Sequence, residues 1–176
     1  EDKVLPNAGS MLHAHAVPPE GGDTIWADLY AAWDTLDEDI KRRVAGRRAR
    51  FSRIDLHNVH YPSEPPLTDE QKRDRPDVHH PIARRHPRSG RTALYVGRWA
   101  IDIEGLPADE GRALIAQLQD HTRQERFQYR HSWRVGDALL WDNRCTLHSA
   151  TGFDDAKYVR MMFRTTLEGE TPLMAA

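Results

Sequence analysis

Several short stretches spread along the chain alternate apolar and polar positions, which is the pattern of strands with one buried face. The stretches that show this alternation, or a short apolar run between turn residues, are residues 10–17, 47–54, 80–85, 92–96, 99–104, 127–133, 138–141 and 158–167. Glycine, proline and other turn-forming residues separate these stretches, which favours antiparallel pairing. The sequence therefore predicts a core that is rich in sheet.

Three other stretches repeat their apolar residues at helical spacing. Residues 26–36 predict one helix, and residues 37–45 predict a second, short helix that Gly46 is placed to end. The clearest helix is predicted for residues 106–123, where Pro107 suits the first turn. Strands interrupted by such helices indicate an α+β fold, a jelly roll or barrel with helical insertions.

One polar segment, residues 55–77, is interrupted by prolines and shows no clear period. We expect a long loop there, and loops of this length in compact domains are often functional lids or mobile segments. No internal repeat and no low-complexity linker divides the chain, so residues 1–176 are expected to form a single domain.

The composition narrows the class of protein. A formal charge of −2 over 176 residues argues against a dedicated nucleic-acid binder, which usually carries a large positive excess. No apolar run approaches the ~20 residues that span a bilayer, and the first residues show no signal-peptide pattern. Cys145 is the only cysteine, which excludes an internal disulfide and leads us to expect a cytoplasmic protein.

The stretch from residue 136 to residue 164 holds the most informative chemistry. The run WDNRCTLH ends at His148, and Arg160 and Arg164 follow it four residues apart. On a strand, residues four apart share one face and lie about 13 Å from each other. Two cations on the same face of a mostly buried strand need anionic partners, which could be an acidic ligand or the carboxylates of structural salt bridges.

Four ordered motifs resemble the taurine and 2,4-dichlorophenoxyacetate dioxygenase family. They are PPEGGDTIWADLYAAWDTL at 18–36, HPIARRHPRSGRTALYVG at 80–97, IEGLPADEGRALIAQLQDH at 103–121, and WDNRCTLH with the two arginines after it. The third motif, and the run FQYRHSWRVGD at 127–137, are more similar to the 2,4-dichlorophenoxyacetate branch. The resemblance covers nearly the whole chain and implies a double-stranded β-helix.

The resemblance also implies an activity. Enzymes of this family use Fe(II), 2-oxoglutarate and O2 to hydroxylate a small substrate, and they release succinate and CO2. Two histidines and one carboxylate hold their iron. The resemblance makes His148 the distal histidine ligand, assigns Thr24 and Arg160 to the distal carboxylate of 2-oxoglutarate, and assigns Arg164 to the acidic group of the substrate.

Two further features of the motif bear on this assignment. Asp142 and Asn143 could be mistaken for metal ligands, but the resemblance gives them no such role, and we expect them to shape the turn that aims His148. The spacing from His148 to Arg160 is one residue longer than the family pattern, which a one-residue insertion at residues 152–157 would explain.

The family's other two iron ligands form a His-x-Asp motif, and no His-x-Asp or His-x-Glu occurs in the 176 residues. Two interpretations stay open: an N-terminally incomplete part of a normal enzyme, which we favour, or a natural short relative without a complete ligand set. His13 and His15 share a strand face and could hold a metal together. The resemblance places their segment after the ligand motif, so we do not expect a substitute site there.

The remaining histidines and the cysteine have simpler interpretations. His57, His60, His79 and His80 flank the predicted long loop, where they could border the substrate entrance; we do not expect them to bind metal. Cys145 lies inside the motif without a recognisable His-Asp arrangement near it in sequence, so we expect a small core residue rather than a nucleophile.

The sequence leaves two alternatives to an enzyme: a non-catalytic jelly-roll module that binds a small carboxylic acid through Arg160 and Arg164, and a structural fragment without a ligand. Iron content and 2-oxoglutarate binding would separate them. The expected partner is a small acidic organic molecule, and the branch resemblance favours an aryloxyalkanoate over a sulfonate. A homo-oligomer is also compatible with the family, whereas nucleic acid and membrane are not expected partners.

Overall fold

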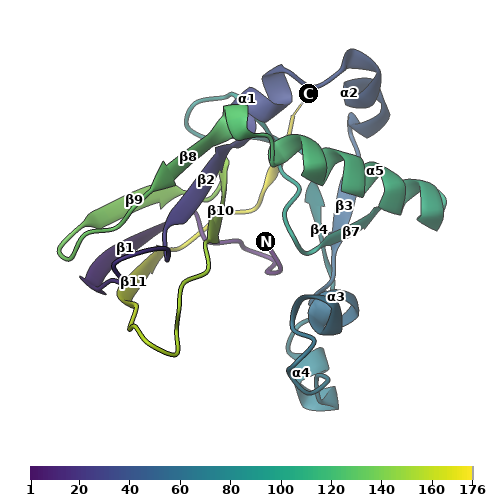
Figure 1. Cartoon of the computed structure of the whole chain (residues 1–176). Coiled ribbons are helices and arrows are strands. Elements are labelled where there is room, and N and C mark those ends of the chain that lie inside the picture. Colours follow the sequence, from purple (N-terminus) through teal and green to yellow (C-terminus); the bar gives the residue numbers. More distant parts are fainter. Residues whose placement is uncertain (176) are drawn as a thin grey trace.

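The computed structural model describes residues 1–175, and the strands in this part form four three-stranded antiparallel sheets (Figure 1). The strands are β1 (Gly9–Ala16), β2 (Thr24–Asp28), β3 (Arg48–Phe51), β4 (Val78–Pro81), β5 (Ala83–Arg85), β6 (Thr92–Leu94), β7 (Ala100–Ile103), β8 (Gln128–His131), β9 (Ala138–Asp142), β10 (Thr146–Ala150), β11 (Met161–Leu167) and β12 (Leu173–Met174). The helices are α1 (Leu29–Asp34), α2 (Glu38–Val44), α3 (Arg53–His60), α4 (Asp69–Arg73), α5 (Ala108–Thr122) and the 3-10 turn η1 (Glu125–Phe127). The strand orders are β11-β1-β9, β10-β2-β8, β12-β5-β6 and β4-β3-β7.

Two of these sheets pack against each other through tryptophan side chains. Trp26 from β2 lies 5.3 Å from the ring of Trp141 on β9 and 6.3 Å from that of Trp133, measured between ring centroids. Ala14 on β1 completes this buried cluster. A large aromatic side chain buries about 150–250 Å². The three indoles therefore hold sheet β11-β1-β9 against sheet β10-β2-β8.

The second core lies where the helices meet the other sheets. Leu114, Ile115 and Leu118 of α5 are buried there with Phe51 of β3 and Leu29 of α1. Figure 1 shows α5 running beside β7, and Gly111 permits this approach, because a β-carbon at this position would lie 2.9 Å from the backbone nitrogen of Ile103. The helix predicted for residues 106–123 is thus confirmed, as is the short helix before Gly46.

The predicted helix at residues 26–36 is wrong for its first three residues. Residues Thr24–Asp28 form strand β2, which pairs with both β10 and β8, and the helix begins only at Leu29. Asp28 caps that helix, because its carboxylate accepts hydrogen bonds from the backbone N–H groups of Tyr30 and Ala31. Pairing on both sides and burial of Trp26 outweigh the helical spacing.

The predicted loop at 55–77 is also corrected, since α3 and α4 both lie within or across it. Ser52 caps α3 by accepting from the backbone N–H of Asp55, at 3.0 Å. Thr68 and Gln71 form a reciprocal capping box at the start of α4. Only His57 of α3 and no residue of α4 is buried, so neither helix has the regular buried apolar stripe from which a helix is predicted.

The α+β content is confirmed, but no closed barrel forms within residues 1–175. The chain passes from one facing sheet to the other at residues 143–145, because β9 pairs with β1 whereas β10 pairs with β2. Strand β10 itself was missing from the predicted strands. No helix in residues 1–175 combines the length and the apolar character that crossing a membrane requires.

Candidate active site

Strand β10 carries His148 to the edge of the tryptophan cluster. His148 lies opposite Trp26 in the antiparallel register, and its ring packs edge-on against Trp141 with centroids 4.9 Å apart. Surrounding protein, together with the charge of Arg164, lowers the pKa of His148 to about 4, although the side chain is open to a cavity. The imidazole is therefore neutral at pH 7, which is the form that binds a metal ion.

The turn before β10 is held by Asp142 and Asn143. The carboxylate of Asp142 accepts hydrogen bonds from the backbone N–H of Arg144 at 2.8 Å and from its guanidinium at 2.9 and 2.7 Å. Asn143 accepts from the indole of Trp141 at 2.8 Å and donates to the hydroxyl of Ser10 at 3.0 Å. The prediction that these two residues shape the turn is confirmed.

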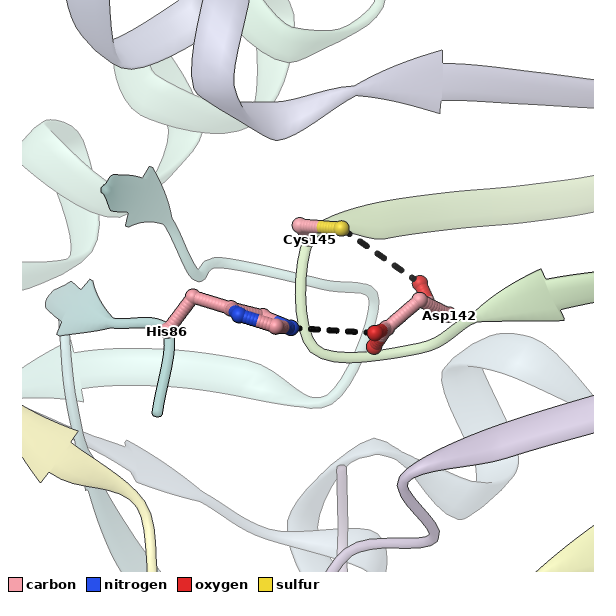
Figure 2. A group of neighbouring side chains, drawn as sticks. All are labelled: His86, Asp142 and Cys145. Atoms are coloured by element: carbon pink, nitrogen blue, oxygen red, sulfur yellow. Dashed lines mark hydrogen bonds and ion pairs between the residues drawn. The ribbon is translucent and has the colours of Figure 1, made fainter. Parts of the chain in front are cut away.

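Asp142 also belongs to a cluster with His86 and Cys145, whose potential ligand atoms lie within 4.8 Å of one another (Figure 2). His86 Nδ1 accepts from the backbone N–H of Ser89 at 3.1 Å, so its Nε2 carries the proton and donates to Asp142 at 3.0 Å. Burial raises the pKa of the Cys145 thiol, which stays protonated at pH 7. The ligand atoms are thus engaged in holding the turn, and this cluster is not a candidate metal centre.

The structure brings Thr24 and Arg160 together. Arg160 immediately precedes β11; its Nε donates to the carbonyl of Gly22 at 2.8 Å, and its Nη2 donates to the hydroxyl of Thr24 at 3.4 Å. The indole of Trp133 donates to the same hydroxyl at 2.9 Å. Burial lowers the pKa of Arg160, and no acidic side chain within residues 1–175 forms an ion pair with it. The pair can therefore accept a carboxylate.

Arg164 lies four residues further along, on β11, and it lines the same cavity as His148. Its Nη2 donates to the hydroxyl of Ser10 at 3.2 Å. The expectation of a mostly buried strand is wrong: β11 is an edge strand that begins at Met161, and most of its side chains are exposed. Arg164 is exposed, so burial does not require it to have an anionic partner. An anion that entered the cavity would, however, contact it.

The other predicted histidines serve backbone groups or face away. His13 and His15 lie on the outer face of β1, against the ring of Phe163, whereas Arg164 lies on the inner face of the neighbouring strand. His80 is buried, which lowers its pKa to about 4, and its Nε2 bonds the carbonyls of Glu1 and Lys3 at 3.0 and 2.9 Å.

His57 bonds the carbonyl of Pro65 at 3.1 Å, and His60 bonds that of Arg98 at 2.7 Å. His79 faces the carboxylate of Glu104 at 3.6 Å. None of these four histidines belongs to a group of three potential metal ligands within the described residues. His60 does lie near the cavity, through its contact with Trp99.

The cavity has a volume of about 640 Å³. Its lining residues are Glu1, Asp2, Lys3, Pro6, Asn7, Arg53, Tyr61, Tyr95, Arg98, Trp99, Asn143, Thr146, Leu147, His148, Arg164 and Thr166. The aromatic and cationic residues at positions 53–99 were not singled out from the sequence. They come from α3 and from the segment between β6 and β7, and the only available signal was the run Arg98–Trp99 after a predicted strand.

The family described as "Taurine catabolism dioxygenase TauD, TfdA family" matches residues 5–166. A 2,4-dichlorophenoxyacetate dioxygenase dependent on alpha-ketoglutarate, from Burkholderia sp. (strain RASC), is 42% identical over 158 residues, which cover 90% of this chain and 52% of the relative. An (S)-phenoxypropionate/alpha-ketoglutarate-dioxygenase from Sphingobium herbicidovorans is 39% identical over 173 residues, covering 92% of this chain and 58% of the relative.

Solved structures give the same result. The crystal structure of AAD-2 in complex with Mn(II) and N-oxalylglycine superposes with a TM-score of 0.88 at 32% sequence identity. That match covers 98% of this chain and 67% of the solved chain. The chain thus spans about half the length of the curated relatives it matches, and the similarity extends over almost all of its own residues.

Proposed function

Because the chain belongs to the taurine catabolism dioxygenase TauD, TfdA family, we propose that the protein is an Fe(II)- and 2-oxoglutarate-dependent dioxygenase that oxidises a small acidic substrate. The observation that carries this proposal is the arrangement of four side chains. His148 and Arg164 line one cavity, and Thr24 with Arg160 forms a carboxylate-accepting pair on the same pair of facing sheets. We further propose that these sheets belong to a double-stranded β-helix.

One residue of this site, His148, has the properties of an iron ligand. His148 is neutral, opens to the cavity, and has no hydrogen bond to its ring nitrogens from within residues 1–175. A facial site needs two further donors, which the family resemblance places in a His-x-Asp motif. Iron, when bound, supplies the activation of O2 and the oxidative decarboxylation of 2-oxoglutarate.

Thr24 and Arg160 are suited to hold the distal carboxylate of 2-oxoglutarate. The Thr24 hydroxyl already accepts from Trp133 and Arg160, so its own proton is free to be donated. Arg160 has its Nε fixed by the carbonyl of Gly22, which orients the guanidinium plane. A carboxylate bound to this pair would form an ion pair with Arg160 and hydrogen bonds of fixed direction. The 2-oxoglutarate molecule would therefore be held in one orientation.

Arg164 is proposed to anchor the acidic group of the substrate. It shares the cavity with His148, so a bound acid lies close to the metal ligand, and its carboxylate can pair with the planar guanidinium through two hydrogen bonds. We propose an aryloxyalkanoate as the favoured substrate class, supported by the relatives named above, with a sulfonate as the second class. Hydroxylation next to an ether oxygen would cleave the ether.

A turnover measurement tests this function. The complete gene product, supplied with Fe(II), O2 and 2-oxoglutarate, should form succinate and oxidised product in equal amounts from phenoxyacetate. Its neutral amide, phenoxyacetamide, should be a poor substrate, because it leaves Arg164 without an anionic partner. Binding of 2-oxoglutarate and acid without any succinate formation would instead indicate a non-catalytic binding module. If the acid and the amide were oxidised equally well, Arg164 would not be the residue that anchors the substrate.

A further inference from the structure

The cavity has a second cationic wall that the proposed function does not use. Arg53 is the first residue of α3 and Tyr61 is the residue that ends it, while Arg98 and Trp99 lie just before β7. All four line the cavity together with His148 and Arg164. A molecule held at Arg164 would therefore occupy the same cavity as this wall.

A buried indole fixes two guanidinium groups on this wall. The side chain of Trp99 is 7% exposed, and the ring of His60 packs edge-on against it with centroids 4.9 Å apart. The Cζ atoms of Arg53 and Arg98 each lie 5.2 Å from the centroid of Trp99. Arg98 also lies 5.2 Å from the ring of Tyr61. These cation–π contacts cover the aromatic faces, so the wall presents positive charge to the cavity.

The two guanidinium groups differ in their acidic partners. Arg53 donates to the carboxylate of Asp2 at 3.3 Å, which shows that this wall accepts a carboxylate. Arg98 has no carboxylate oxygen within 4.0 Å in the part of the chain that the structure describes. The Glu1 carboxyl lies nearby, but its Oε2 accepts a hydrogen bond from the backbone N–H of Trp99 at 3.5 Å and forms no ion pair with Arg98.

We propose that Arg98 is a second anion-binding residue of this cavity and that the preferred substrate carries two acidic groups. This inference rests on the proposed function, in which Arg164 takes the acidic group nearest His148. The second group, a carboxylate remote from the reacting carbon, pairs with Arg98 on the wall of Tyr61 and Trp99. The guanidinium of Arg98 lies over both rings, and none of its N–H donors forms a hydrogen bond or ion pair within residues 1–175. Its planar set of donors suits a carboxylate better than a lysine ammonium would.

Calorimetric titrations of the complete gene product under anaerobic conditions test this site without requiring turnover. The probes are phenoxyacetate, 4-carboxyphenoxyacetate and 4-carbamoylphenoxyacetate, the last being a neutral match for the ring carboxylate. The wild type should bind the diacid at least tenfold more tightly than the carbamoyl compound. Arg98→Gln should abolish this preference and change the affinity for phenoxyacetate less than twofold, while Arg98→Lys should keep part of the preference.

Arg126→Gln is the matched control. Arg126 is also exposed, and its Cζ atom lies over one aromatic ring, 4.7 Å from the ring centroid of Phe127, but it does not line the cavity. This variant should leave all three affinities unchanged. The proposal would be wrong if Arg98→Gln weakened the binding of all three probes equally, or if the wild type showed no preference for the diacid. An Arg98-dependent preference without succinate formation from any acid would instead leave this site standing and refute the dioxygenase function.

Discussion

At the scale of single residues, a substitution of Arg160 distinguishes the site for 2-oxoglutarate from the site for the acidic substrate. Arg160 is proposed to bind only 2-oxoglutarate. Arg160→Ala in the complete gene product should raise the dissociation constant of 2-oxoglutarate by about 100-fold or more, because a partly buried carboxylate loses its charged partner. The affinity for phenoxyacetate should change much less. Calorimetry with each ligand measures both effects. Loss of the substrate with unchanged 2-oxoglutarate would mean that Arg160 and Arg164 have exchanged roles.

Asp142 makes stability depend on acid pH. Burial by itself would raise its pKa, but hydrogen bonds from Arg144 and His86 lower the pKa to about 2, below the ~3.9 of an unfolded chain. The folded state therefore gains stability that is fully present above about pH 4 and is lost as the pH falls towards 2. Because the Asp142 side chain is 30% exposed and solvent screens its interactions, we expect this contribution to the free energy of unfolding to be roughly 1–2 kcal/mol.

Asp142→Asn should remove that acid-dependent part of the free energy of unfolding. Urea unfolding between pH 2 and pH 7 measures it, and Asp155→Asn, at an exposed position in the loop before β11, is the control. If both variants lose stability with the same pH profile as the wild type, then the network around Asp142 does not hold the turn that precedes His148.

At the scale of elements, the turn before β2 and the loop before β11 depend on each other. The backbone N–H of Gly22 donates to the carbonyl of Gly152 at 3.1 Å, and that of Thr151 donates to the carbonyl of Asp23 at 2.9 Å. Gly21 has a φ of 73°, and a β-carbon there would collide with the carbonyl of Gly152. The turn that ends next to Thr24 and the loop that ends at Arg160 are thereby fixed together.

Gly21→Ala should therefore destabilise the fold by more than Gly90→Ala. Gly90 has nearly the same φ, 72°, but nothing lies within 4 Å of a β-carbon at that position. The control should cost about 1 kcal/mol for backbone strain alone, and Gly21→Ala roughly 2–3 kcal/mol because the loop must also move. Thermal unfolding compares them. Equal losses would show that the loop is not packed on Gly21.

The elements that the sequence predicted well are those whose own pattern decides their structure. The stripe of α5 and the cap-and-glycine pattern of α2 predicted both helices, because their buried faces follow the helical period. Trp26 was misassigned since its strand is set by pairing with β8 and β10, which lie more than a hundred residues away in the chain. The capping box of Thr68 and Gln71 was a readable signal that the prediction overlooked.

The residues of the candidate site also fall into two groups: those that a sequence motif reveals, and those that only the fold brings together. His148, Arg160, Arg164 and Thr24 were selected because short motifs resemble a family. The wall of Arg53, Tyr61, Arg98 and Trp99 was not, because it assembles from two segments separated by more than thirty residues and belongs to no motif. Only the folded chain shows that these aromatic and cationic side chains share a cavity with His148.

At the scale of the whole molecule, these 176 residues should bind Fe(II) weakly when produced alone. His148 is a single ligand, and no group of three potential ligands in residues 1–175 includes it. One imidazole cannot hold a labile divalent ion against water in a facial geometry. An anaerobic titration should show no tight stoichiometric site. Sub-micromolar binding that is lost in a variant with His13 and His15 replaced, but not in His148→Ala, would contradict the assignment.

The most direct test of the account is a crystal structure of the complete gene product with Mn(II) and N-oxalylglycine. We predict the metal within coordination distance of a ring nitrogen of His148, with the distal carboxylate of N-oxalylglycine bound to Arg160 and to the hydroxyl of Thr24. Arg164 should remain free to meet the substrate. A metal held by His86, Asp142 and Cys145, or a distal carboxylate on Arg164 with Arg160 unoccupied, would contradict the account.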